Sequence, residues 1–82
     1  MKLQYEQARE ELLQSNAEFH RLVEEHARYD RELAELLRTR HRRPEDEIEK
    51  ARLKKLKLQA KDRMEELIHE CRRERAEAVQ AT

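Results

Sequence analysis

Histidine, cysteine and carboxylate side chains gather at two places in this chain. His26 and Asp30 lie one helical turn apart, a spacing at which a carboxylate can orient an imidazole for acid–base catalysis. No nucleophile and no set of anion-stabilising donors accompanies them. We therefore predict a structural polar pair that fixes helix register. Of the cations expected opposite Asp30, namely Lys54, Lys55 and Lys57, we assign Lys54 to neutralise it.

The second group is His69 and Cys71, with Glu65 one turn before the histidine. Side chains two residues apart on a helix point in different directions, and no paired-cysteine spacing is present. We therefore predict no metal and no cofactor. Cys71 is expected to act as a small apolar side chain. A lone cysteine excludes an internal disulfide, and the default expectation is a cytoplasmic protein.

A third group is basic and suggests a different chemistry. Lysines recur along residues 50–61, and arginines gather before Pro44. Such patches can hold phosphate backbones. The candidate phosphate contacts are Arg40, Arg42, Arg43, Lys54, Lys57 and Lys61. Against this interpretation, 19 basic residues balance 19 acidic ones, and the few aromatic residues fall on the apolar face, so no stacking platform interleaves with the lysines.

The elements that position these groups are predicted to be helices. Charged residues make up 46% of the chain and glycine is absent, while apolar residues recur at helical spacing among strong helix formers. No apolar run is long enough for a membrane span or a signal peptide. We therefore expect one all-α domain over residues 1–82 with no membrane segment.

Pro44 divides the chain into two halves. Arginines precede it and acids follow it, which complements the dipoles of a helix that ends and a helix that begins. We predict an antiparallel, coiled-coil-like two-helix hairpin: a first helix over about 3–40, a turn at about 41–44 and a second helix over about 45–78. A bend or break near Ser15 and Asn16 is an open alternative, because Ser15 and Glu18 fit a capping box.

Apolar side chains form one face on each predicted helix. On the second helix the stripe comprises Leu53, Leu56, Ala60, Met64, Leu67, Cys71 and Ala78. A reversal near residue 42 places Phe19 opposite Met64 and Leu67, and Leu37 near Ile48 and Leu53. The seam, where the apolar faces of the two predicted helices meet, is too small to enclose a core of its own. We therefore expect assembly into a dimer or a larger helical bundle.

A second apolar strip lies on the opposite side of the second helix. Its members are Ile48, Ala51 and Leu58, and Asp62 shares their side. Single exposed apolar residues are common and need no function. Three of them on one face nevertheless favour an interface with a second copy of the chain, with another helical protein, or with both. No small-molecule substrate is expected.

The motif pattern resembles the YdcH-like proteins, short bacterial proteins of uncharacterised function. In the first half the matching residues are Phe19, Arg21, Leu22, Glu25, His26, Tyr29, Asp30 and Leu33. In the second half they are Ile48, Leu53, Lys54, Lys55, Lys57, Leu58, Lys61, Asp62 and Met64. The resemblance covers about residues 10–68, and Tyr29 stands where an aliphatic residue is usual. It implies a small helical protein with no established activity, so no catalytic residue carries over.

These observations predict a small non-enzymatic interaction or assembly module that uses an amphipathic helical surface. The alternative is a nucleic-acid-binding accessory protein that uses the arginine-rich turn and the lysines of the second helix.

Overall fold

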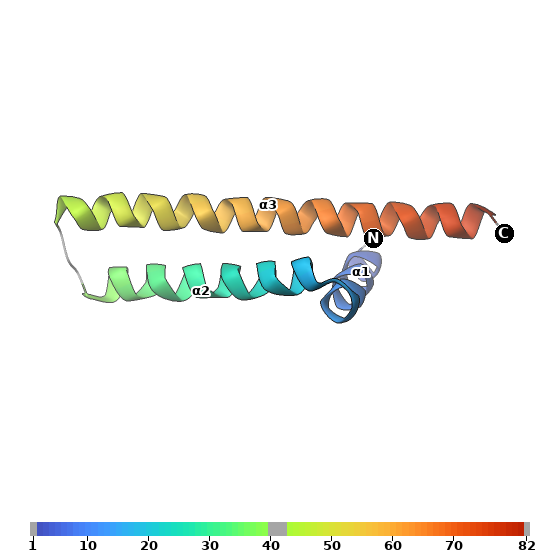
Figure 1. Ribbon diagram of the computed structural model, residues 1–82, viewed down its shortest axis with the longest axis horizontal. Helices are drawn as coiled ribbons and strands as arrows, with labels where there is room; N and C mark the ends of the chain where they lie inside the picture. Colours follow the sequence, from blue (N-terminus) through green and yellow to red (C-terminus); the bar gives the residue numbers. More distant parts are fainter. Residues whose placement is uncertain (1, 40–42, 82) are drawn as a thin grey trace.

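Over the residues that the structure describes, the chain forms three helices. The computed structural model describes residues 2–39 and 43–81, with side chains for 4–38 and 43–79. The helices are α1 (Lys2–Ser15), α2 (Ala17–Thr39) and α3 (Pro44–Ala81). Figure 1 shows α2 and α3 side by side in opposite directions, while α1 turns away from the axis of α2 and packs against α3. The all-α prediction is confirmed, but three helices replace the predicted two-helix hairpin.

Asn16 separates α1 from α2. Its side-chain Oδ1 accepts a hydrogen bond of 2.9 Å from the backbone N–H of Phe19, which makes it the N-cap of α2. Ser15 instead donates from Oγ to the carbonyl of Glu11 at 2.7 Å, a back-bond that weakens the helix end. The break that the sequence left open at Ser15 and Asn16 is therefore present. The predicted capping box is wrong, because Asn16 is the better cap and the Glu18 carboxylate pairs with another helix.

Pro44 is the first residue of α3, where its missing N–H is not needed. The backbone N–H of Arg43 donates to Asp46 Oδ2 at 3.4 Å, so an acid of the first turn helps to close the helix start. The predicted turn at 41–44 falls partly on residues 41 and 42, outside the described residues. At the other end α3 continues to Ala81, past the predicted end at 78. At about 1.5 Å per residue, this helix accounts for the 60 Å length of the molecule.

The apolar core lies where all three helices meet. Phe19 is fully buried and stands at the start of α2. The cluster comprises Ala8, Leu12, Phe19, Leu22, Ala60, Leu67, Ile68 and Cys71, with Met64 packed against it. The predicted register grouped Phe19 with Met64 and Leu67, and the structure places all three there. Further along, Leu33 of α2 and Leu53 of α3 are buried.

Three side chains depart from the predicted stripes. Ile68 was not assigned to the core, yet it is 2% exposed, because α1 packs on α3 and covers a second side of it. Leu37 was predicted to lie near Ile48 and Leu53, but it is 60% exposed near the end of α2. Ala78 is also exposed, since the end of α3 extends beyond α1 (Figure 1).

Candidate interaction surface

The outer strip, which we define as Ile48, Ala51, Leu58 and Asp62, lies on α3 and is exposed. Ile48 is 71% exposed and Leu58 is 58% exposed. At 100° per residue these side chains point away from the seam residue Leu53, which is buried against α2. Two large apolar side chains therefore stand on a face that no other described helix covers.

The predicted polar group around Asp30 is arranged differently. Asp30 accepts a hydrogen bond of 2.5 Å from Lys57 Nζ, and this bond holds the pKa of the Asp30 carboxyl below its ordinary value. Assigning Lys54 as its partner was wrong. Lys57 follows Leu53 by one turn and so sits beside the seam, whereas Lys54 points outward and is exposed.

The exposure of Asp30 limits how much its ion pair with Lys57 contributes to folding stability. Its side chain is 60% exposed, while His26 is half-buried on the same face. His26, one turn earlier, also lowers the pKa of Asp30, but its effect is smaller than those of Lys57 and of burial. An ion pair this exposed to water contributes little to stability. The contact does show which residues of α2 and α3 lie opposite each other.

The strongest polar contact between α2 and α3 was not predicted. Arg63 donates two hydrogen bonds to the carboxylate of Glu18, from Nε at 3.0 Å and from Nη2 at 3.1 Å. It also donates a hydrogen bond to Glu66 at 2.9 Å. A guanidinium fork matches a carboxylate in this way. The sequence offered one signal for this contact, the position of Arg63. Arg63 directly precedes Met64 and so borders the predicted apolar stripe.

Acid should weaken the contact between Glu18 and Arg63. The hydrogen bonds from Arg63 lower the pKa of the Glu18 carboxyl. A carboxyl with a lower pKa in the folded chain contributes stability above its unfolded pKa, and that stability is lost as pH falls through the folded value. We expect Glu18→Gln to lose less stability than the wild type between about pH 5 and about pH 2, measured by urea unfolding.

Glu6→Gln is the matched control for this prediction. It removes the same charge from an exposed residue of α1, so its acid dependence should follow that of the wild type. An unchanged pH profile for Glu18→Gln would show that the Arg63 contact does not stabilise the folded chain.

Polar contacts also tie α1 to α3. The Tyr5 hydroxyl donates to Glu65 Oε1 at 2.8 Å, and this bond raises the pKa of Tyr5. Arg75 forms an ion pair with Glu11. Both contacts join residues at least 60 positions apart, so they hold α1 across α3.

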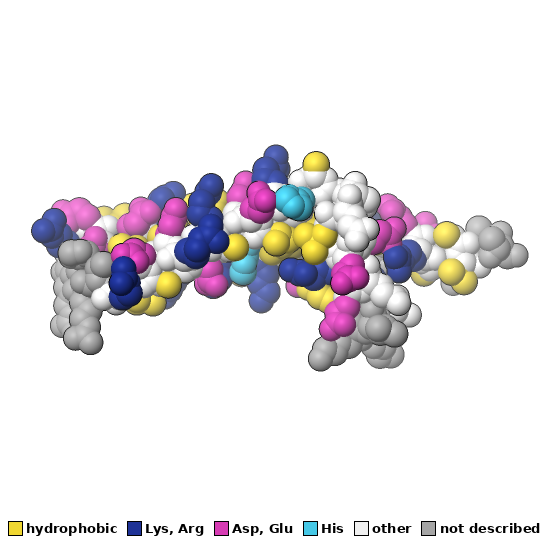
Figure 2. Space-filling view, turned by 90° about the horizontal axis from the view of Figure 1, so that it is seen from below, with side chains coloured by type: hydrophobic (Ala, Val, Ile, Leu, Met, Phe, Trp, Pro, Cys, Tyr) yellow, Lys and Arg dark blue, Asp and Glu magenta, His cyan; other side chains and the backbone are white. Residues whose placement is uncertain are grey.

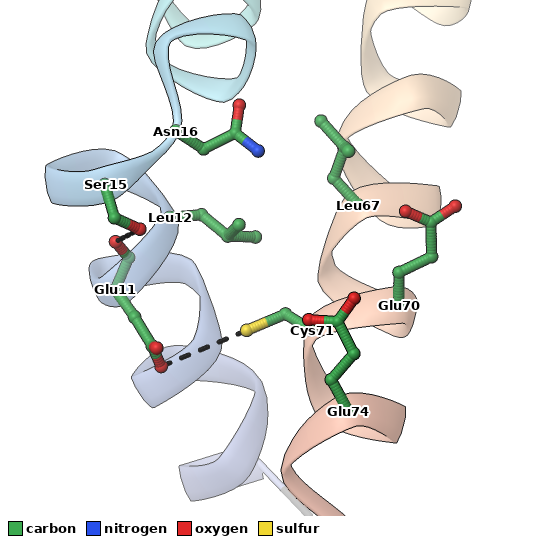
Figure 3. Close-up of a pocket in the computed structure, with 8 residues that line it drawn as sticks. All are labelled: Glu11, Leu12, Ser15, Asn16, Leu67, Glu70, Cys71 and Glu74. Carbon is green, nitrogen blue, oxygen red and sulfur yellow. Dashed lines mark hydrogen bonds between the residues drawn. The ribbon is translucent and has the colours of Figure 1, made fainter.

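Cys71 lies in a pocket between α1 and α3, below the break at Asn16 (Figure 3). Its thiol donates weakly to Glu11 Oε2 at 4.0 Å. Burial and the nearby carboxylate raise the pKa of the Cys71 thiol, which keeps it in the less nucleophilic protonated form. His69 is exposed while Cys71 is buried. Within residues 2–39 and 43–81, no cluster of three or more His, Cys, Asp or Glu side chains is placed to hold a metal.

The predicted phosphate contacts differ in how available they are. Arg43, Lys54 and Lys61 are exposed, and Lys57 is engaged with Asp30. Arg40 and Arg42, also predicted as phosphate contacts, lie outside the described residues. Figure 2 views the molecule from the α2 side, and cations and acids are interspersed over that face. Of the described helices, none has the length and apolarity that a membrane span requires.

One comparison with known proteins gives a match. The family described as "Protein of unknown function (DUF465)" matches residues 19–68, which comprise most of α2, the connection and α3 as far as Ile68. The resemblance to YdcH-like proteins is confirmed, since these belong to that family. α1 and the last part of α3 lie outside the match. No curated protein and no solved structure matches the chain.

Proposed function

Because the chain belongs to the DUF465 family of proteins of unknown function, we propose from its surface that it is a small non-enzymatic interaction or assembly module. Its docking surface is the outer strip of α3, and its partner presents an apolar helical face. The observation that carries this proposal is the exposure of Ile48 and Leu58, at 71% and 58%, on the side of α3 opposite the seam.

The supporting argument is one of geometry. α3 is straight along the length of the molecule (Figure 1), so its outer face offers a long ridge to which another helix can align. Ile48 and Leu58 supply apolar anchors, and Lys55 and Asp62 lie between or beside them with opposite charges. Apolar anchors with a charged rim are typical of helix-docking surfaces, where the charges set orientation.

A non-enzymatic role is proposed because the candidate chemical groups are used in packing. Asp30 pairs with Lys57, Glu18 pairs with Arg63, and the buried Cys71 thiol has a raised pKa. A catalytic site needs a nucleophile or base aimed into a pocket that admits a substrate. The described side chains supply packing and ion pairing instead.

Leu58→Lys tests the proposed surface. The substitution places a charge where the apolar anchor docks, so we expect the assembly of this protein, alone or with its partner, to become smaller in analytical ultracentrifugation. Helicity by circular dichroism should not change, because the side chain is exposed and lysine is a good helix former.

Leu37→Lys is the matched control, since Leu37 is also an exposed leucine, at 60%, but belongs to α2. It should leave the sedimentation profile as in the wild type. If Leu58→Lys and the wild type sediment alike in every preparation, the outer strip is not a docking surface.

Nucleic-acid binding is the second candidate. It is favoured by residues 50–61, which hold six basic residues and no acid, and by the exposure of Lys54 and Lys61. This candidate is weakened because the described side chains include no free aromatic ring on which bases could stack. Phe19 is buried, and Tyr29 packs against the core. Saturable binding of a labelled single-stranded oligonucleotide that falls steeply with salt would favour this candidate.

A further inference from the structure

We propose that the helix that docks on the outer strip is α3 of a second copy of this chain. The two α3 helices run antiparallel, and their two-fold axis passes at the level of Gln59. This inference rests on the proposed function, because it names the partner of the same surface. It is carried by the distribution of charge along α3 together with the exposure of the strip.

The charge along α3 alternates in four blocks. The first block, residues 45–49, is acidic. Residues 50–61 are basic and contain no acid. Residues 62–70 are acidic except for Arg63 and His69, and residues 71–76 are basic except for Glu74. Reading the helix backwards gives the opposite order of signs, so α3 is complementary in charge to an antiparallel copy of itself.

An axis at Gln59 pairs these blocks across two copies. Residues 50–56 of the basic block then lie opposite residues 62–68 of the acidic block in the second copy. The acidic first turn of α3 lies at the level of Arg72 and Arg73 of the second copy. Because the axis is two-fold, each favourable contact occurs twice, as in any isologous interface. A parallel arrangement would instead place each block against its like.

Another antiparallel register would place Ile48 of one copy on Leu58 of the other. This register joins the two largest apolar side chains of the strip. It also places the basic residues 50–57 of one copy against the same residues of the other copy. Like charges placed across an interface cost several kcal/mol. The axis at Gln59 lessens this repulsion, because residues 50–56 then lie level with the mainly acidic residues 62–68, and it still brings the two Leu58 side chains close together.

Lys55 and Asp62 define this register. They lie about one turn before and one turn after Leu58, and both are exposed. In the part of the chain that the structure describes, neither has an ion-pair partner, in contrast with Lys57 and Arg63. Lys55 and Asp62 lie seven positions apart, or about 10 Å along the helix, so they do not reach each other within one chain. The two-fold axis places Lys55 of each copy next to Asp62 of the other.

A charge-exchange experiment tests the register. In Lys55→Glu, Glu faces Asp62 of the second copy; in Asp62→Lys, Lys faces Lys55 of the second copy. We expect each variant alone to self-associate at least about 10-fold more weakly than the wild type. An equimolar mixture of the two, and the double variant Lys55→Glu/Asp62→Lys, should recover association to within about 3-fold, because opposite charges face each other again.

Sedimentation equilibrium from about 1 µM to about 1 mM gives the dimer constants. Arg31→Glu, a charge reversal on an exposed residue of α2, is the control and should associate as the wild type does. Circular dichroism verifies that every variant keeps its helix content.

Three outcomes would overturn the proposal. A wild type that is monomeric over the whole range excludes the second copy as the occupant. Single variants that dimerise like the wild type exclude this register, and so does a mixture that stays as weak as its components. These results are separate from the proposed function, which fails if Leu58→Lys leaves every assembly unchanged.

Discussion

Leu33→Asp is expected to lower the free energy of unfolding by at least about 3 kcal/mol. Leu33 is 8% exposed where α2 packs on α3, and the seam residue Leu53 is 1% exposed. A carboxylate at this position loses its water. Lys57, the nearby cation, is already held by Asp30 at 2.5 Å. A core of this size supplies only about 3–5 kcal/mol, so the variant should be largely unfolded by circular dichroism.

Leu37→Asp controls for the added charge. It makes the same substitution one turn later on α2, at a side chain that is 60% exposed, so we expect a loss within about 0.5 kcal/mol. Both measurements need the same protein concentration, because self-association would add to apparent stability. Equal melting temperatures for Leu33→Asp and the wild type would contradict the observed packing of α2 on α3.

Phe19→Ala should cost about 3–5 kcal/mol, the second large effect. Phe19 is fully buried in the cluster that joins all three helices. Its removal takes apolar area from the core and leaves a cavity between α1, α2 and α3. The backbone N–H of Phe19 also completes the cap on Asn16, but alanine keeps that N–H, so the measured loss reports the side chain alone.

Phe19→Leu is the matched variant. Leucine retains most of the buried apolar area, so it should restore a clear part of the lost stability in urea unfolding. If Phe19→Ala unfolds at the same urea concentration as the wild type, the three-helix cluster is not the core of this protein.

The helices themselves could be predicted from the sequence because their signals are local. Pro44 and the acids after it mark a helix start that needs no tertiary information. The heptad spacing of Phe19 and Leu33 shows which face of α2 is apolar. These features depend on residues within one or two turns of each other.

The direction of α1 could not be predicted in the same way. Its apolar residues continue the spacing of α2, so Ala8 and Leu12 suit either one continuous helix or a helix that folds across α3. The choice depends on the cap at Asn16 and on contacts between distant residues, such as Tyr5 with Glu65. The burial of Ile68 follows from that choice and so escaped prediction.

Ion pairs between helices were the least predictable feature of the candidate site. Several lysines lie near Asp30 in any reasonable register, and a rotation of α3 by about 60° about its axis decides between Lys54 and Lys57. Glu18 had a local partner available in Arg21, but the structure joins it to Arg63. By contrast, the exposure of Ile48 and Leu58 followed directly from helical periodicity.

Site-directed photo-crosslinking at position 58 tests the central claim, that the outer strip of α3 binds a partner, most directly. A benzophenone amino acid replaces Leu58 in one protein and Leu37, exposed on α2, in another. Irradiation in native lysate should give a discrete crosslinked product from position 58 and none from position 37, with mass spectrometry identifying the attached peptide. No product from position 58, or the same products from both positions, would contradict the claim.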